Sequence, residues 1–126
     1  MASSTLHVCI TCRGGNPAAA EGLRPGARLL AAIEQRLDAA GDGIVVAPVE
    51  CLSNCQRGCS AAVTAAGKWT YVIGDLDPDL HAGDVVDFAR QHQAHALGLP
   101  VWRERPAHIR KSTIARVPPM KIEEQR

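Results

Sequence analysis

The chain has 126 residues, 46% of them hydrophobic, which is enough for one hydrophobic core but not for two. Its formal net charge of +1 gives no reason to expect nucleic acid as a partner. No segment approaches the roughly 20 consecutive apolar residues that span a bilayer, and the first residues lack the pattern of a signal peptide. We therefore expect a soluble, cytoplasmic protein without a membrane partner.

The first part of the chain predicts a strand, a helix and a second strand. Residues 5–11 alternate between apolar and polar side chains, as in a strand with one buried face. The stretch 13–26 is rich in glycine and proline and predicts a long loop. Residues 26–40 carry an apolar stripe at helical spacing, and the short apolar run 44–49 predicts a buried strand.

The second part predicts a hairpin, a helix and a tail. Residues 60–65 and 68–73 predict two strands joined by a tight turn, and residues 80–96 predict a helix. The resulting β-α-β-β-β-α order is that of the thioredoxin core, so we expect one α/β domain of thioredoxin-like fold over residues 5–97. Residues 98–126 are basic and contain several prolines, and they predict an extended tail that is flexible or contacts a partner.

The five cysteines form two close groups. Cys9 and Cys12 form a C-x-x-C motif, whereas Cys51, Cys55 and Cys59 form a C-x₃-C-x₃-C run. Thiols stay reduced in the cytoplasm, so these cysteines predict ligands or redox groups rather than structural disulfides. Both groups follow strands expected to be parallel neighbours, which end at the same edge of a sheet. Iron–sulfur clusters take four thiolate ligands, and two such loops together can supply them.

Three features carry a resemblance to a known family. They are the segment Leu6-His7-Val8-Cys9-Ile10-Thr11-Cys12, the Cys51-x-x-x-Cys55 loop followed by Gly58, and the strand Lys68-Trp69-Thr70-Tyr71. Over about residues 5–97 the chain resembles the thioredoxin-like [2Fe–2S] ferredoxins, and more closely a group of small bacterial proteins predicted to bind metal. The resemblance implies an electron carrier rather than an enzyme, with a [2Fe–2S] cluster, a reductase and a terminal acceptor as redox partners, and a homodimer as one expected assembly.

The ligand spacing departs from that family. The family usually places its second ligand roughly a dozen residues after the first, but no cysteine lies between Arg13 and Glu50 here. Cys51 and Cys55 match the family directly, and an N-terminal ligand matches with an uncertain register. We therefore predict the following ligand set, with one alternate: Cys9, Cys12, Cys51 and Cys55, with Cys59 as the alternate.

Two other readings of the cysteines remain open. A Cys₄ set also suits zinc, so a non-redox zinc module or a metal-handling protein is the alternative function. Cys9 and Cys12 could also act as a redox dithiol, although the long loop after Cys12 separates them from the helix whose dipole would lower a thiol pKa. The histidines are scattered, and those of the last helix, His92 and His95, are expected to be solvated.

Overall fold

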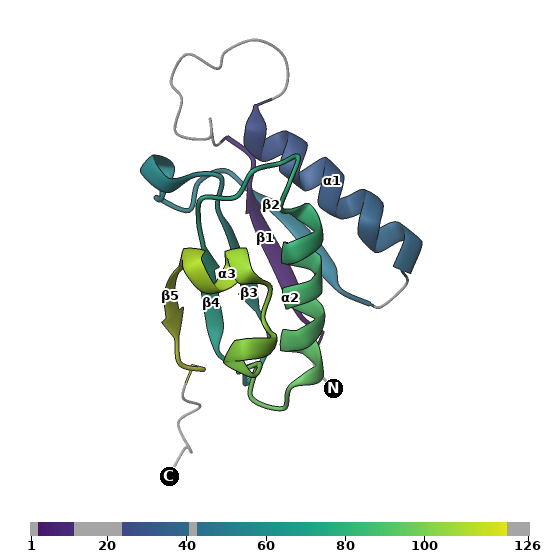
Figure 1. The fold of residues 1–126 in the computed structure, drawn as a ribbon, viewed down its shortest axis with the longest axis vertical. Helices are drawn as coiled ribbons and strands as arrows, with labels where there is room; N and C mark the ends of the chain where they lie inside the picture. Colours follow the sequence, from purple (N-terminus) through teal and green to yellow (C-terminus); the bar gives the residue numbers. More distant parts are fainter. Residues whose placement is uncertain (1–2, 12–23, 41–42, 121–126) are drawn as a thin grey trace.

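The computed structural model describes residues 3–11, 24–40 and 43–120, with the side chains of residues 38–40 left out. Five strands form one mixed sheet in the order β2-β1-β3-β4-β5. The strands are β1 (Thr5–Cys9), β2 (Val45–Val49), β3 (Ala61–Thr64), β4 (Thr70–Ile73) and β5 (Thr113–Val117). Helices α1 (Pro25–Ala40), α2 (Ala82–Ala94) and α3 (Ala107–Ser112) pack around this sheet (Figure 1).

The β1–β2 pair is parallel, and all other neighbouring strands in the sheet are antiparallel. In the parallel register Cys9 lies opposite Val49, and Val8 lies opposite Pro48. The backbone N–H of Ile10 then donates to the Val49 carbonyl at 2.9 Å. The first cysteine therefore lies level with the last residue of β2, at the end of the sheet from which the second cysteine group emerges.

Helix α1 makes the crossover between the parallel strands. It begins at Pro25, whose fixed φ suits a first helical turn. Its buried side chains Leu29 and Ile33 join the core, and the helix packs against β1, β2 and α2. Helix α2 adds Phe88, whose ring meets that of Tyr71 from β4 edge to face, with centroids 5.0 Å apart. The predicted β-α-β-β-β-α order is thus confirmed, and no helix of the described residues is long and apolar enough to cross a membrane.

The predicted extended tail is wrong for residues 102–117. This segment forms a short 3₁₀ turn η2 (Trp102–Glu104), helix α3 and strand β5, which adds to the sheet beside β4. The side chain of Ile109 in α3 is fully buried. The guanidinium of Arg105 donates to the Pro100 carbonyl and to the Tyr71 hydroxyl at 2.8 and 3.1 Å. The folded unit therefore continues to Val117 and does not stop at residue 97.

The expectation that His92 is solvated is also wrong, because its side chain is fully buried. Its Nε2 lies 2.6 Å from the Trp69 carbonyl and its Nδ1 lies 2.7 Å from the Ser4 hydroxyl. Since a carbonyl only accepts, Nε2 carries the proton and Nδ1 accepts from Ser4. Burial, helped by the nearby charge of Lys68, holds the pKa of His92 below its usual value. The core thus contains a neutral imidazole with both ring nitrogens bonded.

The neutral state of His92 predicts a loss of stability in mild acid. In the unfolded chain a histidine titrates near pH 6.5, whereas in the fold the pKa of His92 is lower, so the unfolded chain binds more protons as the pH falls. The neutral His92 ring therefore contributes fully to the unfolding free energy above about pH 6.5, and this contribution is lost as the pH falls below that value. His92→Gln should reduce the pH dependence of the unfolding free energy measured by urea titration, and should lower stability by about 1–3 kcal/mol.

Candidate metal centre

The two cysteine groups meet at the carbonyl of Glu50, the residue before Cys51. The Cys9 thiol donates to this oxygen with an Sγ–O distance of 3.6 Å, and the Thr11 hydroxyl donates to the same oxygen. The carbonyl of Thr11 in turn accepts from Arg24, just before α1, at 3.0 Å. The segment that leads to Cys12 is therefore bound to the segment that leads to Cys51, although the two are about forty residues apart in the chain.

Cys51 and Cys55 form an exposed pair of thiols. The backbone N–H of Ser53 donates to Cys51 Sγ at 3.2 Å, and Ser53 takes a positive φ of 58° in this turn. The Ser53 backbone bond, followed by a side-chain hydrogen bond with Cys55, holds the pKa of Cys51 below its ordinary value. Both cysteines are exposed. A thiolate is the form that binds metal, so this turn favours the ligand state of Cys51.

Cys59 lies in a different environment. Its side chain is fully buried in the hydrophobic core, and its backbone pairs with that of Leu76 in both directions, at 3.1 and 3.0 Å. Cys12 lies outside the described residues. Among the residues that are described, no three side chains of His, Cys, Asp or Glu converge closely enough to hold a metal ion. The predicted ligand set is thus represented by one buried strand-end thiol, Cys9, and the exposed pair.

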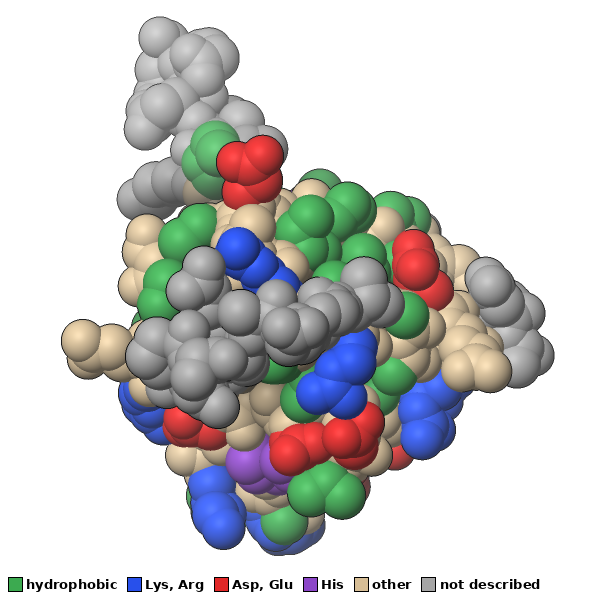
Figure 2. Space-filling view, turned by 90° about the horizontal axis from the view of Figure 1, so that it is seen from above, with side chains coloured by type: hydrophobic (Ala, Val, Ile, Leu, Met, Phe, Trp, Pro, Cys, Tyr) green, Lys and Arg blue, Asp and Glu red, His purple; other side chains and the backbone are tan. Residues whose placement is uncertain are grey.

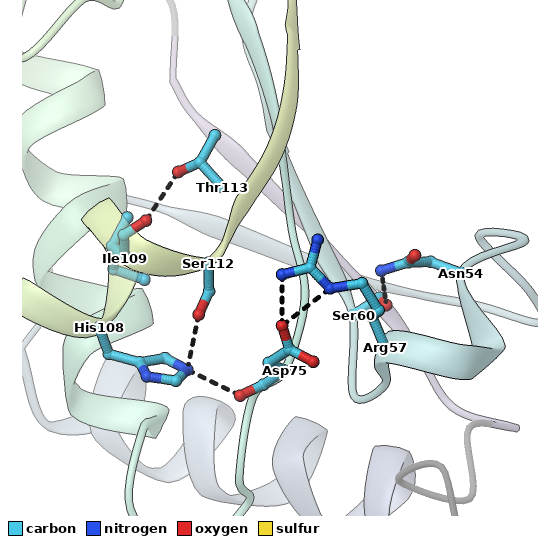
Figure 3. Close-up of polar contacts among 8 residues, drawn as sticks. All are labelled: Asn54, Arg57, Ser60, Asp75, His108, Ile109, Ser112 and Thr113. Atoms are coloured by element: carbon cyan, nitrogen blue, oxygen red, sulfur yellow. Dashed lines mark hydrogen bonds and ion pairs between the residues drawn. The ribbon is translucent and has the colours of Figure 1, made fainter.

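Several contacts fix the turn η1 (Cys55–Arg57), which carries Cys55 (Figure 3). Asn54 donates from its side-chain amide to the Ser60 hydroxyl at 2.9 Å, which closes the loop on itself. Arg57 binds one carboxylate oxygen of Asp75 through two guanidinium nitrogens, at 2.9 and 2.5 Å. The Asp75 N–H donates to the Arg57 carbonyl at 2.5 Å. The cysteine loop is therefore attached to the end of β4 through side chain and backbone together.

Helix α3 contacts the same residue, Asp75, through the side chain of His108. His108 Nε2 lies 2.7 Å from the Asp75 carbonyl and 3.2 Å from the Ser112 hydroxyl. The His108 ring stacks on His81 at the start of α2, with centroids 3.5 Å apart. Partial burial and the neighbouring His108 hold the pKa of His81 below its usual value, despite the opposing effect of Asp84 and Asp77. One residue, Asp75, thus joins the cysteine loop to β4 and α3.

Sequence reasoning missed these supporting residues, among them Arg57, whose guanidinium is paired with Asp75. The available signal was Gly74 directly after a predicted strand, because a glycine at such a position often marks a close approach of another backbone. Figure 2, seen from this end of the molecule, shows carboxylate and basic side chains side by side with histidine.

The match to a known family extends beyond the domain predicted over residues 5–97. A family model described as "Protein of unknown function (DUF1636)" matches residues 6–119. No curated protein matches the chain significantly. Among solved structures, the chain is similar to a thioredoxin-like [2Fe–2S] ferredoxin from Aquifex aeolicus, with a TM-score of 0.57 and 16% identity over 97% of this chain and 100% of that one.

A second structure, the wild-type form of a thioredoxin-like [2Fe–2S] ferredoxin from Aquifex aeolicus, gives a TM-score of 0.54 and 19% identity. This alignment covers 91% of this chain and 99% of that one. At this level of identity the similarity concerns the arrangement of the backbone. It confirms the thioredoxin-like fold expected from the sequence.

The donor atoms at this end of the sheet suit a soft or borderline metal centre. Thiolates are the ligands of iron–sulfur clusters and of Cys₄ zinc sites. A backbone N–H directed at sulfur, as in the bond from Ser53 to Cys51, is the kind of contact that tunes such centres. The described thiols therefore fit a thiolate-bound group in kind.

Gly74 is the position where the attachment of the cysteine loop can be tested. A Cβ on this residue would lie 2.7 Å from the Asn54 side-chain nitrogen and 2.8 Å from the Arg57 carbonyl oxygen. Gly74→Ala should therefore displace the loop and lower the unfolding free energy by about 1–3 kcal/mol. In Gly83→Ala, the matched control, the new methyl group meets only the flexible end of Arg36, at 3.2 Å. Equal losses in both variants, measured by thermal unfolding, would contradict the proposed tight contact.

Proposed function

The chain belongs to the DUF1636 family, whose description assigns no activity, and from its cysteine geometry we propose that it is a one-electron carrier that binds an iron–sulfur cluster of the [2Fe–2S] type. The proposal depends mainly on one observation. The thiol of Cys9 and the hydroxyl of Thr11 both bind the carbonyl that precedes Cys51, so the two cysteine-bearing segments leave the sheet together. Solved structures of the same fold that are described as [2Fe–2S] ferredoxins support it.

The proposed ligands are Cys9 and Cys12 from the first segment and Cys51 and Cys55 from the second. A [2Fe–2S] cluster bound there would supply a centre that accepts and releases a single electron. Cys59 is the alternate ligand. Cys9 and Cys59 are both buried in the core, and Cys9 is placed in the first set because its thiol binds the carbonyl that precedes Cys51.

The chain's own residues would prepare this centre in two ways. The Ser53 N–H stabilises negative charge on Cys51 before and after metal binding. The Arg57–Asp75 pair and the Asn54–Ser60 bond hold the loop, so that the positions of Cys51 and Cys55 depend little on the metal. Both thiols are exposed, so a reductase and a terminal acceptor could approach this end of the sheet.

The proposal is tested by purifying the protein under anaerobic conditions and measuring iron, acid-labile sulfide and zinc per chain. We expect a brown protein with visible charge-transfer absorption that bleaches on reduction with dithionite. A colourless protein with one zinc per chain would refute the electron-carrier function and favour the alternative, a non-redox zinc or metal-handling module. That alternative requires the same four thiolates and no redox partner.

Single substitutions test the ligand assignment. Cys55→Ser should lose the cluster or shift its absorption and electron paramagnetic resonance spectra, because a thiolate ligand is replaced. Cys59→Ser should keep the spectrum, and its main effect should be a modest loss of stability from placing a hydroxyl in the core. The reverse pattern, a lost cluster in Cys59→Ser and an intact one in Cys55→Ser, would show that the ligand set is wrong.

A further inference from the structure

Charge is unevenly distributed between the C-terminal segment and the rest of the chain. Residues 101–120 carry five basic side chains and one acidic side chain, whereas residues 1–100 carry seven basic and ten acidic side chains. The near-zero net charge of the protein therefore conceals a basic segment attached to an acidic body. Because this segment is folded as η2, α3 and β5, its charges occupy fixed positions on the molecule.

Most of these charges lie away from the cysteines. Along β4, Ile73 pairs with Thr113 and leads into Gly74, which contacts the cysteine loop, whereas Thr70 pairs with Val117 at the opposite end. Trp69, just before β4, and Gly74, just after it, are roughly 15 Å apart at the usual rise per residue of a strand. The Trp69 N–H donates to the Leu97 carbonyl, in the segment that links α2 to η2. The end of β5 and the turn η2 therefore lie near the β3–β4 turn, at the end of the sheet remote from the candidate metal centre (Figure 1).

Two arginines at this end are held on tryptophan rings. The Arg116 guanidinium lies 4.7 Å from the centre of the Trp69 ring, and that of Arg110 lies 5.0 Å from the centre of the Trp102 ring. Arg110 also donates to the Arg103 carbonyl at 3.5 Å. Stacking restricts these long side chains before any partner arrives, so less entropy is lost when they bind a carboxylate.

The same region combines basic and apolar exposed surface. Arg116 lies opposite Tyr71 in the β4–β5 register, and Arg105 lies over the Tyr71 ring at 5.1 Å, so these groups share one side of the sheet. Trp102 is 62% exposed and Val101 and Val117 are also exposed. Ion pairs in the described part of the chain join Arg28 to Asp79, Arg57 to Asp75 and Arg90 to Asp87, so none of them neutralises this surface.

We propose that this basic–aromatic surface docks an acidic face of a partner protein, at a site separate from the candidate metal centre. The surface is defined by Trp69, Trp102, Arg103, Arg110 and Arg116. Exposed tryptophan and arginine surrounded by further charge is the composition of protein interfaces. The site leaves the cysteine end accessible, so the bound partner and a redox partner can be held at the same time.

The charge distribution favours a protein over a long polyanion. A nucleic acid or an anionic membrane extends beyond a local patch and would meet the acidic remainder of the chain, which repels it. An acidic patch on a protein is limited in extent and can match the basic surface alone. Complementary charge of this kind also speeds the encounter and makes it sensitive to salt. The inference concerns only this surface and does not depend on which metal the cysteines bind.

The chain contains two tryptophans, and both lie in the proposed surface, so their indole N–H signals report on it directly. The full chain is labelled with nitrogen-15, and a short synthetic peptide of glutamate and leucine is added to it at low and at high salt. The indole N–H signals are followed by proton–nitrogen NMR at each peptide concentration. Both indole signals should shift at low salt, and the shifts should weaken at high salt. In Arg110→Gln/Arg116→Gln the affinity should fall about three- to tenfold, as expected from two exposed charge pairs.

The matched control removes the same charge elsewhere. Arg28→Gln/Arg36→Gln, both on α1, should bind the peptide as the unaltered chain does. If the first double variant folds poorly, Arg103→Gln, at an exposed position in η2, should still weaken binding. An equal loss in the control, or no indole shift, would overturn the proposal. Tighter binding of a single-stranded oligonucleotide or of anionic lipid vesicles than of the peptide would also overturn it, in favour of a phosphate ligand.

Discussion

The parallel pairing of β1 with β2 is the constraint on which the candidate metal centre depends. Parallel neighbours finish at the same edge, and the register that sets Cys9 opposite Val49 brings two distant cysteine groups to one place. Such a pair needs a crossover, which here is α1, held against the sheet by Leu29 and Ile33. The packing of an apolar helix face therefore determines where the thiols lie, before any metal contributes binding energy.

The regular elements of the domain could be predicted because their signals are local. Alternation identified β1, the helical stripe identified α1, and the turn between two β-rich runs identified the β3–β4 hairpin. The C-terminal segment could not be predicted in this way. Helix α3 has only six residues, β5 contains Arg116 and is followed by two prolines, and the pairing of β5 with β4 leaves no mark in the local sequence. The basic and proline-rich composition of this segment therefore led to the prediction of a tail, although the segment is folded.

The difference between local and non-local signals also decides which features of the site could be predicted from the sequence. The common location of the cysteine groups follows from strand order, which the sequence supplies. The support of the loop by Asp75 and the burial of His92 are non-local: His92 binds Ser4, 88 positions away, and Asp75 binds Arg57 and His108 from two other elements. Histidine on a short helix is normally solvated, so nothing near His92 in the sequence could indicate a partner at the N-terminus.

The addition of β5 also changes what the sheet presents to other molecules. Without it, β4 would be an edge strand, and its Thr-Tyr-Val-Ile run has the β-branched and aromatic composition of segments that assemble into fibrils. With it, the outer strands are β2, where Pro48 has no N–H to offer, and β5, where Arg116 adds charge. Both borders thus discourage recruitment of a foreign strand, and the C-terminal segment protects the protein against aggregation.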